Sequence, residues 1–477
     1  MHTAAIPPLI NSLAEYIAGA RKQPLPEPVR QRAVHHVADT IGAIVSGSRL
    51  PAGELGAAFI RDHGGSGPCH VFGSPTTTTP IMAAFANGLS AHADETDDSH
   101  APSLSHPGCA VVPAVLAAAE LVDANGTDVL RTTVLGYDVG ARINCALNPA
   151  EFREAGHSTH SIGPTFGAAA AAAALMDLDV RQIRHVLSFA AQQASGLSCW
   201  MRDPDHLEKA FDFGAMPARN GISAALMVAS GFTGVDDVFS GPRGFFDAYD
   251  ESRRTGLPVQ PELLIEGLGT SYEIMRANIK RWSVGSPIQA ALDAIELLIG
   301  RRATPPEVIT RLVVRLPEQG ADTVDNRHSP SICVQHLCAV MLVDGTVTFA
   351  SSHDLARMSD PQVLDVRQKV VLIGDPELTR AMPSRQAIVE LHRTDGTTDR
   401  EHVQLVRGTW SNPMNAKEVQ RKVHDLSLPV VGEAQAASLV EKLWSLDEDA
   451  QPRQLFSVGS QSADPEPERP REIGGPA

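Results

Sequence analysis

Cysteine is rare in this 477-residue chain, and its six cysteines are scattered without a CxxC pair. A large protein with this pattern has neither the framework of a disulfide-stabilised secreted domain nor the paired ligands of a zinc or iron–sulfur site. The spacing therefore predicts reduced thiols and a cytoplasmic location. The residues are Cys69, Cys109, Cys145, Cys199, Cys333 and Cys338.

Long apolar runs and an excess of positive charge are also missing. No apolar run reaches the roughly 18 residues that a membrane-spanning helix needs, and the first residues lack the basic start and apolar stretch of a signal peptide. The formal net charge of -16 argues against nucleic-acid binding, because phosphate contacts need clustered Lys and Arg. We therefore expect neither a membrane nor a nucleic-acid partner.

Several familiar catalytic signatures are absent as well. The chain contains no GxSxG, P-loop or dinucleotide fingerprint, which disfavours serine hydrolases, NTPases and Rossmann enzymes. Its composition, with 43% hydrophobic and 20% charged residues, is typical of a globular protein. The length predicts two or three domains.

Apolar residues at helical spacing fill the chain up to about residue 265 and return after residue 405. The alanine run 168–174 is predicted to be a packed helix, because alanine is the best helix former. Other helices are predicted at Leu9–Arg21, Pro28–Ser46, Ile81–His92, Ala110–Asp123, Val129–Leu147, Val180–Ser195, Met216–Ser230, Ala416–Leu426 and Glu433–Trp444.

β-branched and alternating segments are confined to the region between about residues 268 and 405. Strands are predicted at Tyr272–Ile279, Val308–Leu316, Lys369–Ile373 and Gln386–Leu391, with helices at Pro287–Leu298 and Cys333–Leu342. The pattern predicts a mostly α fold, with residues 1–267 and 406–449 in an all-helical domain and 268–405 in an inserted α+β domain. Residues 450–477 show no periodicity and are predicted to be a disordered tail.

The most unusual stretch runs from Asn87 to Gly108, where four carboxylates fall within five residues among histidines and serines. Such carboxylates repel one another by roughly 1 kcal/mol per close pair in water. A solvated acidic loop is the ordinary interpretation. Imidazoles with pKa values near neutrality and apolar flanks favour a functional site instead. The stretch contains Asp94, Glu95, Asp97 and Asp98 together with His92, His100 and His106.

Four other segments carry groups that would suit an anionic substrate: GHSTHS, EKAFDFGAMPARNG, ANIKRWSVGSP and HSPSICVQH. The first precedes a glycine-rich helix start, whose free N–H groups suit a carboxylate. Structural histidines and solvated lysines are the alternative interpretation of each segment. The candidate residues are His157 and His160, Lys209 and Arg219, Lys280 and Arg281, and His328, Gln335 and His336.

Metal binding is a further alternative for the acidic stretch, because His92, Asp94, Asp97, Asp98 and His106 offer nitrogen and oxygen donors. No HExxH motif, paired CxxC or EF-hand spacing accompanies them. We therefore predict a site without metal.

Six motifs in this order resemble the MmgE/PrpD family, which includes 2-methylcitrate dehydratase, cis-aconitate decarboxylase and iminodisuccinate epimerase. They span about residues 8–450 and read NGLSAHADETDDS, SHPG, GHSTHSIGPTFGAAAA, EKAFDFGAMPARNG, IKRWSVGSPIQAALDA and QHLCAVMLVDG. The resemblance implies a helical domain built from both ends of the chain, an inserted α+β lid, and an active site between them. It also implies a homodimer that needs no organic cofactor.

Carried over by motif, the resemblance assigns site residues to Glu95, Ser99, His106, His157, Lys209 and Lys280. We predict His106, His157, Lys209, Lys280 and His336 as catalytic, and Glu95, Asp98, Ser99, Arg281 and Gln335 as substrate-binding. Three features differ from the decarboxylase-like pattern: a longer spacer before His106, Ala210 after Lys209, and His336 in place of a frequent tyrosine.

The chemistry implied is removal of a proton from carbon next to a carboxylate. Ammonium groups of Lys209 and Lys280 would stabilise the dianion that forms, and imidazoles would act as general base and acid. We expect a cofactor-independent lyase, chiefly a dehydratase of a 2-hydroxy di- or tricarboxylate. A decarboxylase or epimerase of a similar polycarboxylate is the alternative, and a non-catalytic carboxylate-binding protein is the alternative from another class.

Overall fold

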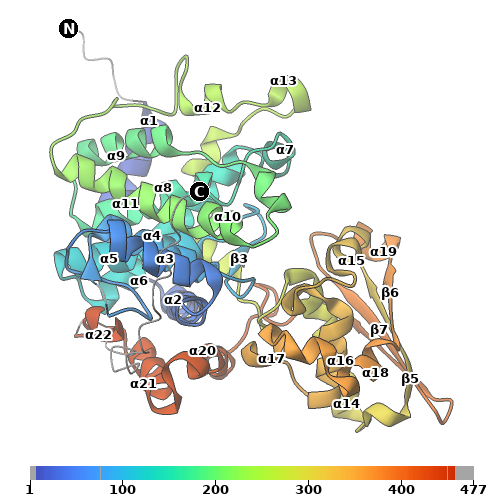
Figure 1. Cartoon of the computed structure of the whole chain (residues 1–477). Helices are drawn as coiled ribbons and strands as arrows, with labels where there is room; N and C mark the ends of the chain where they lie inside the picture. Colours follow the sequence, from blue (N-terminus) through green and yellow to red (C-terminus); the bar gives the residue numbers. More distant parts are fainter. Residues whose placement is uncertain (1–6, 76, 448, 457–477) are drawn as a thin grey trace, which may run out of the picture.

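The computed structural model describes residues 7–75, 77–447 and 449–456. Buried apolar side chains form two large clusters. One draws on residues from Ile10 to Ile279 and again from Met414 to Leu455, and the other on residues from Trp282 to Val406. We call these parts the helical domain and the smaller domain. Figure 1 shows them side by side, with the C-terminal helices in red packed on the helical domain. The mostly α fold predicted from the sequence is confirmed.

The centre of the helical domain is α8, whose alanine run is completely buried against α6 and α11. Small side chains allow this close approach: a Cβ at Gly167 would overlap the carbonyl oxygen of Gly136 on α6. The helices are α1 Pro8–Ala20, α2 Glu27–Gly47, α3 Pro51–His63, α4 Pro80–Ala91, α5 Gly108–Val122, α6 Gly126–Ala146, α7 Pro149–Glu154, α8 Ile162–Leu175, α9 Val180–Gln193, α10 Leu207–Ala210, α11 Met216–Ala229, α12 Phe245–Ala248, α13 Ser252–Thr255, α20 Ala416–Val431, α21 Glu433–Trp444 and α22 Arg453–Phe456.

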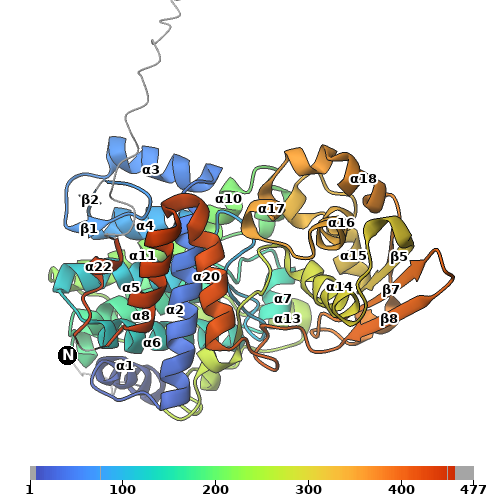
Figure 2. The same cartoon turned by 90° about the horizontal axis from the view of Figure 1, so that it is seen from below.

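The C-terminal helices complete the helical domain by packing beside α2, as Figure 2 shows. Lys422 of α20 forms a buried ion pair with Asp39 of α2 at 2.5 Å and donates to the backbone oxygen of Thr96 at 2.9 Å. Residues from both ends of the chain therefore support the segment that follows α4.

Short strands and single turns connect these helices. Two antiparallel pairs, β1 with β2 and β3 with β4, have two residues in each strand. The strands are β1 Cys69–His70, β2 Thr77–Thr78, β3 Ser99–His100 and β4 Ala277–Asn278. The 3-10 turns lie at Ser198–Arg202, Pro261–Leu264, Glu273–Arg276, Ser286–Ile288, Pro306–Val308, Pro330–Ile332 and Ala356–Ser359, and a π-helical turn spans Phe211–Ala215.

The smaller domain contains a four-stranded sheet in the order β6-β5-β7-β8. β6 is parallel to β5, and the other neighbours are antiparallel. Helices α14 and α16 pack on this sheet. The elements are β5 Ile309–Leu316, β6 Val370–Gly374, β7 Ala387–Arg393, β8 Thr398–Val403, α14 Gln289–Arg301, α15 Glu318–Val324, α16 Val334–Asp344, α17 Phe349–His353, α18 Pro361–Arg367 and α19 Pro376–Arg380.

Three details differ from the sequence-based predictions. The segment Tyr272–Ile279 is mostly a 3-10 turn that places Ile274 and Ile279 in the larger core, so the two cores separate after Ile279 rather than at residue 268. Strand β8 was not predicted, because TDREHV is a charged edge strand without an apolar pattern. In the predicted tail, α22 packs Leu455 into the helical domain, and residues 457–477 lie outside the described residues.

Two expectations drawn from the composition concern membrane-spanning helices and the state of the cysteines. Within the described ranges, no helix is long and apolar enough to cross a membrane. All six cysteines are free, as their scattered spacing predicts.

Candidate active site

The acidic stretch is a buried turn between the end of α4 and the start of β3. Asp94, Asp97 and Asp98 are all at most 8% exposed. Asp94 accepts hydrogen bonds from the backbone N and the Oγ1 of Thr96 and pairs with Nε2 of His353 in α17 at 2.9 Å. The stretch is therefore a junction between the two domains rather than a solvated loop.

Asp97 anchors two histidines within this turn. Its carboxylate lies 3.0 Å from Nδ1 of His92 and 3.1 Å from Nδ1 of His106. Burial raises the pKa of Asp97, but the histidines and the nearby ammonium of Lys280 lower it more, and the pKa stays well below its usual range. Burial lowers the pKa of His106 to about 4, so its imidazole is neutral near pH 7. Because Nδ1–H donates to Asp97, Nε2 of His106 carries the free lone pair.

Two lysines converge on Glu95 in the same turn. Lys209, from α10, forms an ion pair with its carboxylate, and Nζ of Lys280 donates to its backbone oxygen at 2.6 Å. Lys280 also lies 3.6 Å from Asp97. Burial raises the pKa of Glu95. The two ammonium groups lower it by a larger amount, so it stays well below its usual range. The cluster Glu95, Asp97, His106, Lys209 and Lys280 is called the ion-pair cluster below.

β-sheet pairing and a π-helical turn position the two lysines. Ser99 of β3 pairs with Asn278 of β4, two residues before Lys280. Ser99 accepts a hydrogen bond from Asn278 at 3.4 Å and thus lies at the edge of the ion-pair cluster. Lys209 is followed by the π-helical turn Phe211–Ala215, which turns the ring of Phe213 toward the histidines. π-turns of this kind frequently occur at functional sites.

Of the two histidines in GHSTHS, His160 contacts the ion-pair cluster. Its ring lies 5.3 Å from that of His106 and stacks on Phe213 at 3.6 Å. His157 points elsewhere, stacking on Phe152 at 4.4 Å, and its Nε2 lies 3.4 Å from Glu251. Sequence reasoning singled out both histidines but selected His157. The spacing before the helix did not reveal which of them faces the acidic turn.

Three other predicted site residues have partners away from the ion-pair cluster, and a fourth, His336, has no partner for either ring nitrogen among the described residues. Asp98 accepts from His36, Tyr137 and the backbone N of Gly108, and its side chain is completely buried. In the smaller domain, Arg281 pairs with Glu296 and Gln335 donates to Asp325. His336 is completely buried on α16, and burial lowers its pKa to about 4. The described contacts of Asp98, Arg281 and Gln335 are those of structural side chains.

Comparison with known families matches the chain in two regions, the second of which covers the smaller domain and also α20 and α21 of the helical domain. A model of the MmgE/PrpD N-terminal domain matches residues 11–257, and a model of the MmgE/PrpD C-terminal domain matches residues 282–446. This chain belongs to the MmgE/PrpD family. The gap between the two matched regions contains Ile279, after which the two cores of this MmgE/PrpD protein separate.

Similar proteins include several with an assigned activity. The chain is 26% identical to the cis-aconitate decarboxylase-like protein oryM of Aspergillus oryzae, over 94% of this chain and 96% of that protein. It is 25% identical to cis-aconitate decarboxylase of Homo sapiens, over 87% and 86% of the two chains. It is 24% identical to cis-aconitate decarboxylase of Aspergillus terreus, over 92% and 93%. The similarity thus extends over both domains.

Several residues near the ion-pair cluster were missed as site candidates. His206 lies with its Nδ1 4.0 Å from Glu95, and Trp200 lies with its ring 5.5 Å from Nζ of Lys209. His353 reaches the acidic turn from the smaller domain. No motif in the sequence relates these residues to the turn, because each depends on contacts between distant segments.

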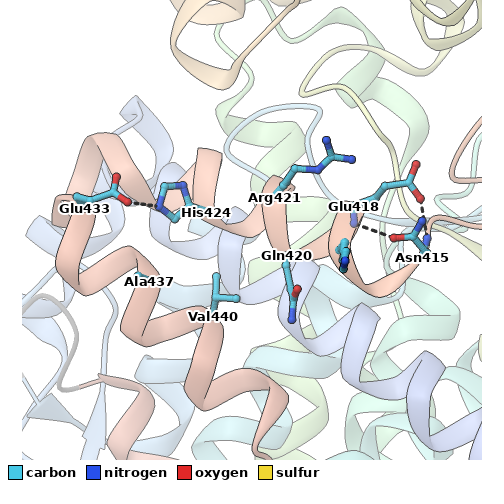
Figure 3. A pocket seen from close by; sticks show the side chains of 9 residues that line it. Asn415, Glu418, Gln420, Arg421, His424, Glu433, Ala437 and Val440 are labelled. Carbon is cyan, nitrogen blue, oxygen red and sulfur yellow. Dashed lines mark hydrogen bonds and ion pairs between the residues drawn. The ribbon is translucent and has the colours of Figure 1, made fainter.

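A surface cavity of about 840 Å³ lies between α20 and α21 (Figure 3). His424 and Glu433 form an ion pair at 3.1 Å within it, while Arg421 extends along its side. Its lining is mixed in charge and contains none of the predicted site residues. The chemistry expected from the sequence therefore belongs to the acidic turn.

Buried ionisable groups couple the stability of this MmgE/PrpD protein to pH. Burial lowers the pKa of His106 and His336 from 6.5 to about 4 and also lowers those of His92 and His160. Between pH 6.5 and about pH 4, these histidines bind protons in the unfolded chain but not in the folded chain. They therefore make the free energy of unfolding fall as the pH falls. Since one pKa unit corresponds to about 1.4 kcal/mol, His106 and His336 are each expected to contribute a loss of about 2 kcal/mol from about pH 7.5 to about pH 5, measured by urea denaturation. Asp138 and Asp212, whose pKa values burial raises to about 7, act in the opposite direction and offset part of this loss.

His353 acts in the opposite direction, because Asp94 overcomes the effect of burial and raises its pKa. The variant His353→Gln is the matched control and should make the acid-induced loss larger. An acid-induced change that is the same in His353→Gln as in the unaltered protein would contradict the expectation.

Proposed function

We propose that this MmgE/PrpD protein is a lyase that removes a proton next to a carboxylate of a small polycarboxylate, and that it dehydrates a 2-hydroxy di- or tricarboxylate. The observation that supports this most is the ion-pair cluster itself. A neutral imidazole held by Asp97 stands beside two ammonium groups held by Glu95. Such a set provides both a base and the positive charge that a carbanion next to a carboxylate requires.

His106 is the proposed general base. Asp97 accepts the Nδ1 proton and holds the ring, so the lone pair on Nε2 is free to take a proton from the substrate. When the imidazolium forms, the carboxylate at 3.1 Å stabilises it. The low pKa of about 4 in the free protein would rise once a polyanionic substrate lies nearby, because negative charge favours the protonated imidazole.

Lys209 and Lys280 are proposed to stabilise the aci-carboxylate dianion. Lys280 is 4% exposed and Lys209 is 17% exposed, so both ammonium groups are screened little by water. A substrate carboxylate would share these cations with Glu95. His160, with a pKa well below its usual range because of burial, is neutral and is proposed to donate a hydrogen bond to the departing hydroxyl, which takes up the proton held by His106 and leaves as water.

Decarboxylation is the second candidate reaction, because the relatives named above are cis-aconitate decarboxylases. It uses the same machinery: loss of carbon dioxide leaves negative charge on carbon, which the two ammonium groups would stabilise before a proton returns. Epimerisation would return the proton to the other face without loss of a group. All three reactions are proposed to proceed without an organic cofactor.

Proton NMR in deuterated water distinguishes these reactions. The purified protein is incubated with citrate, methylcitrate, aconitate, malate-like and iminodisuccinate substrates. A new vinyl signal identifies dehydration, loss of carbon dioxide identifies decarboxylation, and exchange of the α-proton alone identifies epimerisation. A protein that binds these compounds without any exchange or turnover would be a carboxylate-binding protein, and the proposed function would be wrong.

Metal removal tests the proposal of a metal-free reaction. Within the described part of the chain, His92, Asp97 and His106 form a group whose ligand atoms all lie within 4.8 Å of one another, so their donors would suit a zinc ion. We expect turnover to stay within about twofold after dialysis against a chelator, because Asp97 and the lysines already carry the charges that the mechanism uses. A stoichiometric metal whose removal abolishes turnover and whose return restores it would contradict this expectation.

The family resemblance predicts a homodimer, and the cysteine pattern predicts a cytoplasmic location. A homodimer is tested by light scattering of the purified protein. A cytoplasmic location is tested by fractionation of the cells that make it.

A further inference from the structure

His160 is the proposed donor to the departing hydroxyl, so the groups that fix its ring matter for the reaction. The ring stacks face to face on Phe213, with the ring centres 3.6 Å apart and the two planes at 8°. Within the described residues, Nδ1 of His160 has no hydrogen-bond partner. The orientation of this ring therefore depends on Phe213 and on the backbone of His160 itself.

A chain of two hydrogen bonds ties that backbone to the π-helical turn. The backbone N of His160 donates to Oγ of Ser158 at 3.3 Å, and the Ser158 hydroxyl donates to the carboxyl group of Asp212. Asp212 directly precedes Phe213 in the π-helical turn Phe211–Ala215. The turn therefore holds His160 twice, by its ring through Phe213 and by its backbone through Asp212.

Asp212 is buried without a cation. It is 5% exposed, and Ser158 is completely buried. Among the residues that the structure describes, no lysine, arginine or histidine pairs with the carboxyl group of Asp212. Burial raises the pKa of Asp212 to about 7, although the hydrogen bond from Ser158 lowers it. Because burying a carboxyl group without a cation costs free energy, such groups are typical of functional sites.

The segment around Gly196 packs directly against this link. A Cβ at Gly196 would lie 1.9 Å from Oγ of Ser161 and 2.6 Å from Oδ1 of Asp212. The carbonyl oxygen of Gly196 accepts from the backbone N of Ser158 at 3.1 Å, and the Ser161 hydroxyl donates to the backbone oxygen of Ser195 at 2.6 Å. Neighbouring backbone therefore fixes the positions of both hydroxyls beside Asp212.

We propose that Asp212 is a positioning residue that holds His160 in place for the loss of the hydroxyl. It acts through Ser158 and Phe213, and it keeps the His160 ring 5.3 Å from the ring of His106. A displacement of about 1 Å at a reacting group can cost about 10²-fold in rate. The role rests on the proposed function, because it assigns Asp212 to the loss of the hydroxyl and leaves the removal of the α-proton to His106.

Deuterium exchange separates these two steps for citrate, methylcitrate and a malate-like substrate. In Asp212→Ala the Ser158 hydroxyl loses its acceptor, so loss of water should slow about 10- to 100-fold. His106 is still present, so exchange of the α-proton with deuterated water should continue. The ratio of exchange to water loss, measured by proton NMR, should therefore rise by about 10-fold or more. Asp212→Asn keeps an oxygen that accepts from Ser158 and should keep the ratio of the unaltered protein.

Two further variants complete this comparison. Ser158→Ala breaks the link at its other end and should reproduce the effect of Asp212→Ala. Asp205→Ala is the matched control, because Asp205 is an exposed aspartate seven residues before Asp212, and it should change neither rate. If Asp212→Ala and Ser158→Ala both keep the ratio of the unaltered protein, with full or reduced turnover, Asp212 only stabilises the fold and the inference is wrong.

NMR of isotope-labelled histidine tests the positioning of His160 without turnover. Stacking on Phe213 shifts the His160 ring signal upfield, and His160→Asn identifies that signal by its loss. Asp212→Ala should move the signal downfield, whereas Asp212→Asn should leave it in place. A signal that stays in place in Asp212→Ala would overturn the inference. If the signal moves but the unaltered protein neither exchanges nor dehydrates any substrate, the proposed function fails while the positioning of His160 by Asp212 stands.

Discussion

Replacing His106 with glutamine is expected to lower kcat on the polycarboxylate substrate by about 10²–10⁴-fold, the usual contribution of a general base. Glutamine can still donate a hydrogen bond to Asp97 from its amide, so the turn after α4 should keep its conformation. Its amide has no lone pair basic enough to take a proton from carbon. The loss should therefore appear in kcat, while the melting temperature changes by only a few degrees.

The matched control for this variant is His63→Gln, because His63 is an exposed histidine on α3 without a place in the ion-pair cluster. It should retain full turnover. If His106→Gln keeps more than about a tenth of the original kcat, His106 is not the base. Asp97→Asn separates the two roles further: it leaves the imidazole in place but removes the acceptor that holds the Nδ1 proton, and a large loss of kcat is expected from it as well.

Lys209→Met is expected to have the second largest effect, a loss of about 10²–10³-fold in kcat, which is typical when one group that stabilises developing negative charge is removed. Methionine preserves the length of the side chain and its packing between Trp200 and Phe213, which Nζ approaches to 5.5 and 5.3 Å from the ring centres. The loss of charge also leaves Glu95 with one partner fewer. We therefore expect a destabilisation of up to about 3 kcal/mol.

A double variant separates the two consequences of removing this ammonium. Glu95→Gln combined with Lys209→Met removes both charges of the ion pair, so most of the stability should return while kcat stays low. Recovery of both stability and turnover would show that the lysine only neutralises Glu95 and would refute its role in the reaction. Lys417→Met, at an exposed lysine on α20, should change neither property.

The sequence identified the centre of the candidate site but not its surroundings. Glu95, His106, Lys209 and Lys280 lie in short motifs, and the structure brings all four together. Arg281 follows Lys280 directly yet pairs with Glu296 on the other side of the chain. Neighbouring side chains in an extended segment point in opposite directions. Only one residue of a basic pair can therefore face the acidic turn, and the sequence did not show which one.

The same limit explains the two histidines of GHSTHS. His157 and His160 are three residues apart, and the path of the chain into α8 decides which ring meets His106.

Hydrophobic periodicity by itself determined which long segments of this MmgE/PrpD protein become helices, because the period of 3.6 residues is a local property of the chain. Only the tertiary structure decided which polar groups meet. The pairing of Ser99 with Asn278 brings Lys280 to within 2.6 Å of the backbone oxygen of Glu95, across 185 residues. Contacts of this kind depend on the packing of both domains at once, and no local pattern encodes them.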